Sequence, residues 1–379
     1  MTGCLPDVRV LDMSRMLAGP WAGQLLADFG ADVVKVEPSW GDEARQSGAF
    51  TAANRGKRSI VIDVATEAGQ AVMRGLVAKA DVLIEAHDAG GLMRFGLDYA
   101  TLSVVNPRLV YCSVTGFGRT GPYAGRAGFD PVLQAMSGLM SVTGGAPGTA
   151  GAGPAPVGYG APEINAGFYA ALAIMAALHH RDVVSGRGQL IDLAILDSQI
   201  AAHSHVAMDW LASGMQPERL PVQRGMAAQV NTPWQAFEAA DRPLMVAVGD
   251  DRMFAAFCGV IGLAEVPGDE RYASNAGRMA HVGTLVPLIE GAMAAQTAQS
   301  WMEALEAAGV PSGAINDFGA VAADPHVAAR AMLLEFEGEP MVANPVRFSG
   351  SPVTYRRGVP ALGADTAGVL QDWLGLVPE

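Results

Sequence analysis

The stretch at residues 154–197 constrains the fold of this chain more than any other. It begins with glycine and proline, and after Pro162 apolar residues recur at helical spacing, at Ile164, Phe168, Leu172, Met175 and Leu178. A glycine-containing turn at 185–188 then leads into an apolar run at 190–196, which is typical of a buried strand. Because a helix that feeds a buried strand is the repeating unit of α/β proteins, this stretch predicts the α/β fold class.

Glu163 lies in the first turn of that predicted helix, directly after Pro162, a residue suited to a first helical position. A helix N-terminus presents unpaired N–H groups and a partial positive charge, so it favours an ionised carboxylate that can act as a nucleophile or base. Acidic residues also occupy first turns without any further role. The spacing alone therefore leaves both interpretations open.

The N-terminal part of the chain alternates between strand and helix patterns. Strands are expected at 9–12, 33–37, 60–63 and 81–85, with a further strand that ends near Thr115, and helices begin near 18 and 67. This is the βαβ pattern of a parallel sheet. The first turn has no G-x-G-x-x-G sequence, so a dinucleotide cofactor is not indicated.

The second half of the chain changes character. Residues 144–160 read as a loop, and Asp197 is suited to cap a helix at 198–211. A strand at 243–249, a helix capped by Asp250 and helices at 282–295 and 299–307 predict a smaller α/β domain. The predicted organisation is a large domain at 1–213, a linker at 214–225, the small domain at 226–317 and a return segment at 318–379 that completes the large domain.

Composition excludes several classes of protein. With 379 residues, 50% hydrophobic and 17% charged, the chain can bury large cores and is not disordered. The net charge of -13 argues against nucleic-acid binding, and an anionic ligand would need a local basic patch.

The apolar run at 167–178 is too short to cross a membrane, and the start of the chain lacks a leader pattern. Three scattered cysteines lack metal-ligand spacing and suit a reducing compartment, so we expect a cytoplasmic protein without a metal.

Several motifs resemble the class III CoA-transferases, the family of formyl-CoA transferase and carnitine CoA-transferase. The central match comprises residues 156–158, an acid at 163 that precedes Gly167 by four positions, residues 169–172 and residues 186–189. The resemblance extends over nearly the whole chain. Further matching motifs lie in the C-terminal segment and at 12–20, 30–37, 128–140 and 308–311.

The resemblance implies an architecture and a reaction. It implies a Rossmann-like large domain built from the N- and C-terminal segments, a smaller α/β domain, and two interlocked chains that form a homodimer. It also implies transfer of CoA from an acyl-CoA to a small carboxylic acid, with coenzyme A as a substrate and no tightly bound cofactor.

The resemblance also assigns residues. In the family an Asp at the position of Glu163 forms a mixed anhydride with the acyl group, so Glu163 is the implied nucleophile, and Gly158 and Gly160 are candidate N–H donors to an oxyanion. The implied CoA-contacting positions are Leu17, Ala18, Ile62, Asp63, Val64, Ala65, Ala86, His87, Arg94, Gly128, Phe129 and Asp130.

Departures from the family pattern keep other activities open. Glu163 replaces the family's Asp, Ala65 stands where relatives often carry Lys, and residues 86–90 lack an Arg that relatives commonly show. A related racemase would carry a His where Phe129 stands, as a base for the carbon beside the thioester. The alternatives are therefore an acyl-CoA racemase or isomerase, and a CoA-binding relative without catalysis.

A cluster of cations at Arg55, Lys57 and Arg58 has two interpretations. Such clusters usually form a solvated surface. In the family, however, the same string precedes a strand end that borders CoA.

Overall fold

The computed structural model describes residues 3–88, 90–149, 151–217, 219 and 230–376. It divides into two compact units, the first comprising 1–140, 156–215 and 326–379 and the second 141–155 and 216–325. The predicted domain bounds stay a prediction, and this division differs from them by grouping 141–155 with the second unit. Of the predicted linker 214–225, positions 218 and 220–225 lie outside the described residues.

In the described part of the chain, the first unit contains a six-stranded parallel sheet with the order β3-β2-β1-β4-β5-β8. Its strands are β1 (Arg9–Asp12), β2 (Asp32–Glu37), β3 (Arg58–Val61), β4 (Val82–Glu85), β5 (Val110–Thr115) and β8 (Leu190–Ala194). The central strand β1 pairs Val10 with both Val33 and Val82, and all three side chains are buried. Strands that are buried on both faces have nearly continuous apolar sequences, which is the pattern that predicted them. The predicted α/β class with a parallel sheet is confirmed.

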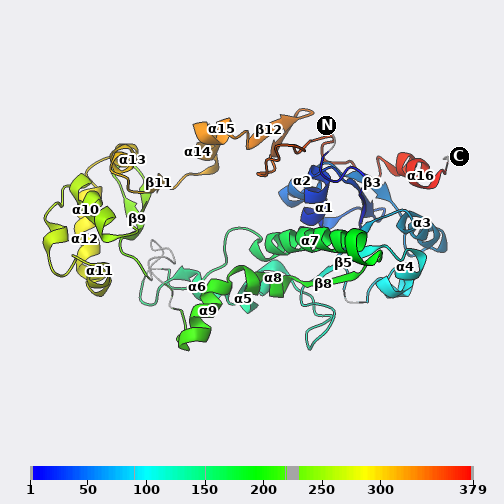
Figure 1. The fold of residues 1–379 in the computed structure, drawn as a ribbon, viewed down its shortest axis with the longest axis horizontal. Helices are drawn as coiled ribbons and strands as arrows, with labels where there is room; N and C mark the ends of the chain where they lie inside the picture. Colours follow the sequence, from blue (N-terminus) through cyan, green and yellow to red (C-terminus); the bar gives the residue numbers. More distant parts are fainter. Residues whose placement is uncertain (1–2, 89, 150, 218, 220–229, 377–379) are drawn as a thin grey trace. The chain divides into compact units, whose positions relative to one another are not determined.

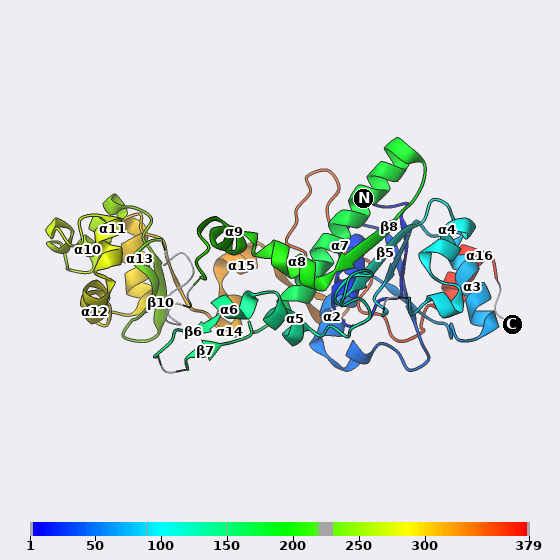
Figure 2. The same cartoon turned by 90° about the horizontal axis from the view of Figure 1, so that it is seen from below.

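Helices cover both faces of this sheet (Figure 1, Figure 2). The larger helices of the first unit are α1 (Ala18–Asp28), α2 (Gly48–Asn54), α3 (Glu67–Val77), α4 (Tyr99–Val105), α5 (Asp130–Met136), α7 (Ala161–His180), α8 (Ile195–Ala202), α9 (Ser204–Ser213) and α16 (Thr366–Leu374). One buried cluster joins α1 and α7 to the strands, and another joins α3, α4 and α16 to the opposite face. The C-terminal helix α16 therefore belongs to the same core as the N-terminal strands.

Helices α1 and α7 pack closely because α7 carries a glycine at their contact. A Cβ atom at Gly167 would lie 2.9 Å from the carbonyl oxygen of Ala18 and 2.9 Å from the Cβ of Trp21. Beside it, Trp21 meets Phe168 edge to face. The helical run Ala161–Ser185 is long and apolar enough to span a membrane by length and composition, but half of that span is buried inside the protein. The buried half packs in the core against α1 and the sheet.

Several element boundaries differ from the sequence-based expectation. The predicted strand at 190–196 ends at Ala194, and the predicted helix at 198–211 begins earlier and divides at His203 into α8 and α9. Strand β3 starts two residues earlier than expected because the polar side chains of Arg58 and Ser59 are buried in the ladder. The expected loop at 144–160 contains a short hairpin of β6 (Gly144–Gly145) and β7 (Gly153–Pro154).

The second unit has its own core. Its described strands β9 (Trp234–Glu238), β10 (Pro243–Ala247) and β11 (Ser312–Ala314) form an antiparallel sheet. Its larger helices are α10 (Asp251–Val260), α11 (Asn275–Ala280), α12 (Val282–Met293), α13 (Ala298–Ala307) and α14 (Phe318–Ala323). The Asp250 carboxylate accepts a hydrogen bond from the Met253 N–H at 2.7 Å, so the predicted cap is confirmed.

The interpretation of the cation cluster as a solvated surface is wrong. Arg55, Lys57 and Arg58 are at most 7% exposed, and each forms an ion pair. Lys57 Nζ lies 2.7 Å from an Asp12 oxygen, with both side chains fully buried. Arg58 pairs with Asp32 and, at 2.8 Å, with Asp372 of α16. These cations hold the first unit together.

Candidate active site

The carboxyl ends of β1 and β4 meet where the strand order reverses. From β1 the chain builds β2 and β3 on one side and then returns to place β4 on the other. Ligands of open α/β sheets bind in the crevice at this switch point. Leu17 and Ala18 follow β1, and Ala86 and His87 follow β4. The topology therefore places four of the predicted CoA-contacting residues at one edge.

Glu163 lies at this edge, in the first turn of α7. Gly160 forms the N-cap of α7, and a Cβ atom there would lie 3.2 Å from Leu17 Cδ2 and 3.4 Å from Asp130 Oδ2. The structure thus brings together the N-terminus of α7, the β1–α1 connection and the start of α5. These segments are far apart in the sequence, and they supply the predicted residues Leu17, Asp130 and Glu163.

The electrostatics of Glu163 differ from the expectation for a helix N-terminus. Burial, followed by the negative charge of Asp130, raises the pKa of Glu163 to about 7. These effects outweigh the favourable helix dipole. The Glu163 carboxylate has no hydrogen-bond or ion-pair partner among the described residues. Since basicity and nucleophilicity rise together, such a carboxylate can attack an acyl carbon near neutral pH.

Asp130 is held by Gln134, one helical turn further along α5. Gln134 Nε2 donates to Asp130 Oδ1 at 2.6 Å, while Asp130 Oδ2 is buried without a hydrogen-bond partner among the described residues. Gln134 Oε1 also accepts from the Val157 N–H at 2.9 Å. The sequence analysis did not assign Gln134 to the site. The signal that could have found it is the spacing of Asp130 and Gln134, which places both on one helix face.

The predicted oxyanion donors lie beside this group. The N–H groups of Gly158 and Gly160 have no hydrogen-bond acceptor among the described residues. They remain candidate donors to a tetrahedral intermediate.

Two further predicted positions flank α5. Gly128 packs against Gly116 at the end of β5, since a Cβ atom on Gly128 would lie 2.8 Å from the Gly116 Cα. Phe129 forms the N-cap of α5, and its side chain is 66% exposed. Phe129 therefore lies beside Asp130 but offers no proton-transferring group.

Other predicted positions lie along the same edge without a described contact to Glu163. His87 donates its backbone N–H to Glu85 Oε2 at 2.8 Å, and its buried Nδ1 has no hydrogen-bond partner among the described residues. After β3, the Ile62 side chain is buried in the core, whereas Asp63 and Ala65 are exposed and Val64 is partly buried.

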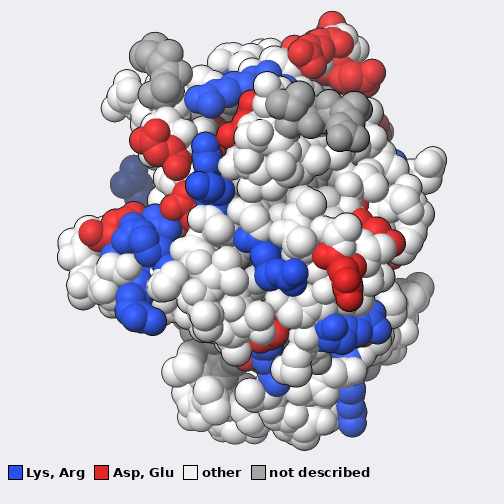
Figure 3. All heavy atoms as spheres, turned by 90° about the vertical axis from the view of Figure 1, so that its right-hand side faces the viewer, with Lys and Arg blue, Asp and Glu red and all other residues white. Residues whose placement is uncertain are grey.

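An anionic ligand such as CoA needs positive side chains near the site, and few are found there among the described residues. Arg94 is exposed, and its guanidinium lies 4.6 Å from the centre of the Phe95 ring. On the face that carries α3, α4 and α16, basic and acidic side chains are interspersed and do not form one positive block (Figure 3). Arg94 is the cation that the sequence predicts for anion binding.

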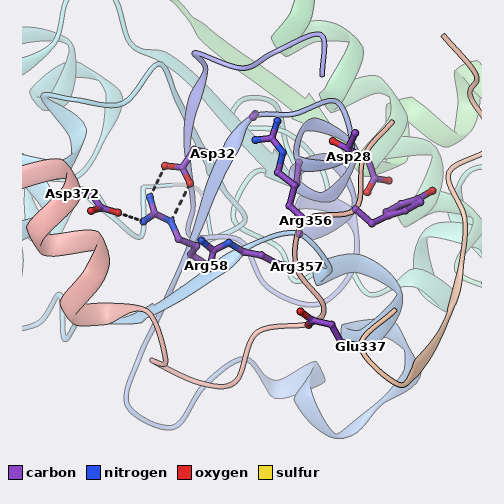
Figure 4. Close-up of a pocket in the computed structure, with 12 residues that line it drawn as sticks. Asp28, Asp32, Arg58, Glu337, Arg356, Arg357 and Asp372 are labelled. Atoms are coloured by element: carbon purple, nitrogen blue, oxygen red, sulfur yellow. Dashed lines mark hydrogen bonds and ion pairs between the residues drawn. The ribbon is translucent and has the colours of Figure 1, made fainter. Parts of the chain in front are cut away.

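A cavity of about 520 Å³ lies at the opposite edge, beside the amino ends of β2 and β3. Arg58, Arg356 and Arg357 line it together with Asp28, Asp32, Asp372 and Glu337 (Figure 4). Cations and carboxylates are mixed there, and Arg58 is already bound to Asp32 and Asp372. None of the predicted site residues lines this cavity.

The described residues include no metal cluster and no disulfide. Within the described ranges, no group of three His, Cys, Asp or Glu side chains is arranged to hold a metal ion. Cys4, Cys112 and Cys258 are unpaired, and burial raises the pKa of the Cys258 thiol to about 12.

Comparison with known proteins identifies the family. Residues 5–366 match the model of CoA-transferase family III. The chain is 42% identical to a succinate–glutarate CoA-transferase of Agrobacterium fabrum, over 97% of this chain and 95% of the relative. It is 36% identical to an acetyl-CoA:oxalate CoA-transferase of Acetobacter aceti, over 98% and 96%. A crystal structure of a CAIB/BAIF family protein from Brucella suis superposes with a TM-score of 0.90 at 38% identity, covering 98% of this chain and 100% of that one. The chain belongs to CoA-transferase family III and is an enzyme that transfers CoA between an acyl-CoA and a carboxylic acid.

Proposed function

We propose that this enzyme transfers CoA between small dicarboxylic acids, with Glu163 as the nucleophile. Relatives at 33% to 42% identity are named for succinate with glutarate, mesaconate or D-citramalate, and another is named for oxalate. Each of these acids carries two carboxyl groups. The shared chemistry of the relatives' substrates supports the same class for this chain.

The reaction begins with attack of a Glu163 oxygen on the thioester carbon. The carbon–sulfur bond breaks, its electron pair leaves on the CoA sulfur as a thiolate, and Glu163 becomes an acyl anhydride. The thiolate then attacks the Glu163 carbonyl carbon, which releases the donor acid and leaves CoA on Glu163. The acceptor carboxylate attacks the carbonyl carbon of this enzyme thioester, which expels the CoA thiolate and forms a second anhydride. The thiolate then attacks the acyl carbon of the acceptor, the carbon–oxygen bond to Glu163 breaks, and the new acyl-CoA leaves Glu163 as a free carboxylate.

The observation that carries this proposal is the paired position of Glu163 and Asp130. Glu163 has a pKa raised to about 7, so it is more basic than an ordinary carboxylate and still ionised in a large fraction at neutral pH. Conversion of Glu163 to a neutral anhydride removes one of two neighbouring negative charges. The like-charge repulsion therefore favours the first covalent step.

Racemisation is less well supported. Deprotonation and reprotonation on opposite faces of a carbon need two proton-transferring groups. The exposed Phe129 stands at the position where a racemase would carry its His. Incorporation of deuterium from heavy water at the α-carbon of an acyl-CoA would reveal such an activity.

We infer that CoA lies along the carboxyl ends of β1, β3 and β4, against the predicted contact residues, and that two chains interlock. Support for the dimer comes from large apolar side chains that are 50% or more exposed on and after helices α7 to α9, namely Phe168, Leu172, Val183, Val184, Met208 and Leu211. A stable folded monomer at nanomolar concentration would contradict the dimer. The unpaired cysteines support a cytoplasmic location.

Chemical trapping tests the nucleophile. Incubation with succinyl-CoA followed by hydroxylamine should modify Glu163 alone, as read by peptide mass spectrometry. Glu163→Gln should lower kcat for transfer by about 1,000-fold or more, the scale for loss of a nucleophile, while the Kd for CoA stays unchanged. Wild-type turnover by Glu163→Gln would show that another group carries the acyl chain.

A further inference from the structure

Gln134 uses both ends of its side-chain amide. Its Nε2 donates to Asp130 Oδ1 at 2.6 Å and to the Tyr159 carbonyl at 3.4 Å, and its Oε1 accepts from the Val157 N–H at 2.9 Å. The side chain is buried, at 2% exposure. These bonds join α5 to residues 157–159, which lead directly to Gly160 and the first turn of α7.

This arrangement orients Asp130 toward α7. With Oδ1 held by Gln134, the other oxygen, Oδ2, lies 3.4 Å from the point that a Cβ atom of Gly160 would occupy. Asp130 Oδ2 is buried and has no hydrogen-bond partner among the residues that the structure describes. An unpaired buried oxygen is costly, so its retention at this point indicates a role for its charge.

We propose that Gln134 is a positioning residue that fixes the Asp130 carboxylate and the segment 157–159 relative to each other, and thereby places Asp130 beside Glu163. This inference rests on the proposed function, in which Glu163 is the nucleophile. In this proposal Gln134 acts through Asp130 and the backbone of 157–159.

The neighbouring charges single out Asp130. Besides Glu163, the ionisable side chains on α7 and on the elements packed against it are Asp28, Tyr111, Cys112, Asp130, Tyr169, His179, His180, Arg181, Asp182, Asp192 and Asp197. Of these, Asp130 is the one whose charge raises the pKa of Glu163, in addition to burial. Asp28 is paired with Arg55, and Arg181 with Asp81 and Asp182. Because attack needs ionised Glu163, the rate should fall as the pH drops below about 7.

Two variants of Gln134 test the inference through the first half-reaction, measured as CoA thiolate release in a single turnover. Gln134→Glu keeps an acceptor for Val157 but replaces the donor to Asp130 with a further negative charge. The acid limb of its pH profile should therefore move upward, by about 0.5 to 1 pH unit. Gln134→Leu removes both links and should lower kcat by about 10- to 100-fold, with KM for the acyl-CoA changed by less than about 3-fold.

Gln199 provides a matched control. It is also buried, and its Oε1 accepts a hydrogen bond from Asn165 of α7 at 2.9 Å, but it does not contact Asp130. Gln199→Leu should lower Tm without moving the acid limb. A purely structural role for Gln134 would give the same result for both residues and would overturn the inference.

The nucleophilic role of Glu163 and the positioning role of Gln134 can be tested separately. If hydroxylamine does not label Glu163 in the wild-type protein, the proposed function is wrong. If Glu163 is labelled and yet Gln134→Glu leaves the acid limb in place, the nucleophile stands and the positioning role of Gln134 is rejected.

Discussion

The first unit contains two groups of charged side chains with opposite organisation, one fully buried and one partly buried. Around β1, β2 and β3, each buried cation faces a carboxylate, as in Lys57 with Asp12 and Lys35 with Asp42. At the start of α7, two carboxylates, Glu163 and Asp130, influence each other, and Glu163 has no cationic partner among the described residues. Compensated charges are what a stable core requires, whereas a like-charge pair costs stability and is typical of reactive sites.

The largest expected effect comes from breaking a compensated pair. Lys57→Met leaves the fully buried Asp12 carboxylate without its partner and should lower the free energy of unfolding by about 3 to 5 kcal/mol. Urea denaturation monitored by circular dichroism measures this. The contrast is Arg108→Met, which removes the exposed pair with Asp182 and should cost about 0 to 1 kcal/mol.

A second variant separates charge from packing at the same position. Adding Asp12→Asn to Lys57→Met removes the uncompensated charge and should restore part of the lost stability. Equal losses for Lys57→Met and Arg108→Met would show that burial of the Lys57–Asp12 pair has no energetic consequence.

The sequence predicts the sheet and helix α7 well, but it does not predict which carboxylates pair with the buried cations. The apolar runs of the parallel strands and the helical spacing after Pro162 depend on local periodicity, so they predicted the sheet and α7. The carboxylate partner of Lys57 lies 45 residues away, and those of Arg58 lie 26 and 314 residues away, so no local pattern identifies them. The cation cluster was therefore read as a surface.

The ionisation of Glu163 also depends on contacts that the local sequence does not show, so the sequence-based expectation for it is wrong. Its first-turn position is a local feature and argued for an easily ionised carboxylate. Burial and the approach of Asp130, which comes from another helix, raise its pKa instead. The resemblance to a family supplied the position of the nucleophile, but tertiary packing determines its ionisation.

The like-charge pair should be detectable as a pH-dependent cost. The pKa of Glu163 is raised from 4.5 to about 7, so the stability that this group contributes is present below pH 4.5 and is lost as the pH rises through about 7. Glu163→Gln does not titrate and should be more stable than the wild type at pH 8, by about 1 to 3 kcal/mol, but not at pH 4.5.

Thermal or urea unfolding at the two pH values measures this difference. Asp197→Asn is the matched control, because Asp197 is an exposed acid in the first turn of α8. It should show no comparable gain at pH 8. A Glu163→Gln protein that is less stable than the wild type at pH 8 would mean that the Glu163 charge is compensated in solution.

The smallest expected effect concerns an exposed cation that belongs to neither group. Arg94 is exposed and stacks on Phe95, and within the described residues no carboxylate is paired with it. Such a cation is free to bind a CoA phosphate. Arg94→Ala should raise the Kd for CoA by about 5- to 30-fold, or about 1 to 2 kcal/mol, as measured by calorimetry. Arg187→Ala, at an exposed cation beyond the far end of α7, should leave the Kd unchanged.

If Arg94→Ala binds CoA normally and Arg119→Ala does not, the phosphates lie instead beside Arg119, a cation 3.6 Å from the buried Glu85 carboxylate. In that case a partly compensated charge would serve the ligand, and the division between structural and functional charges would be less sharp than the two groups suggest.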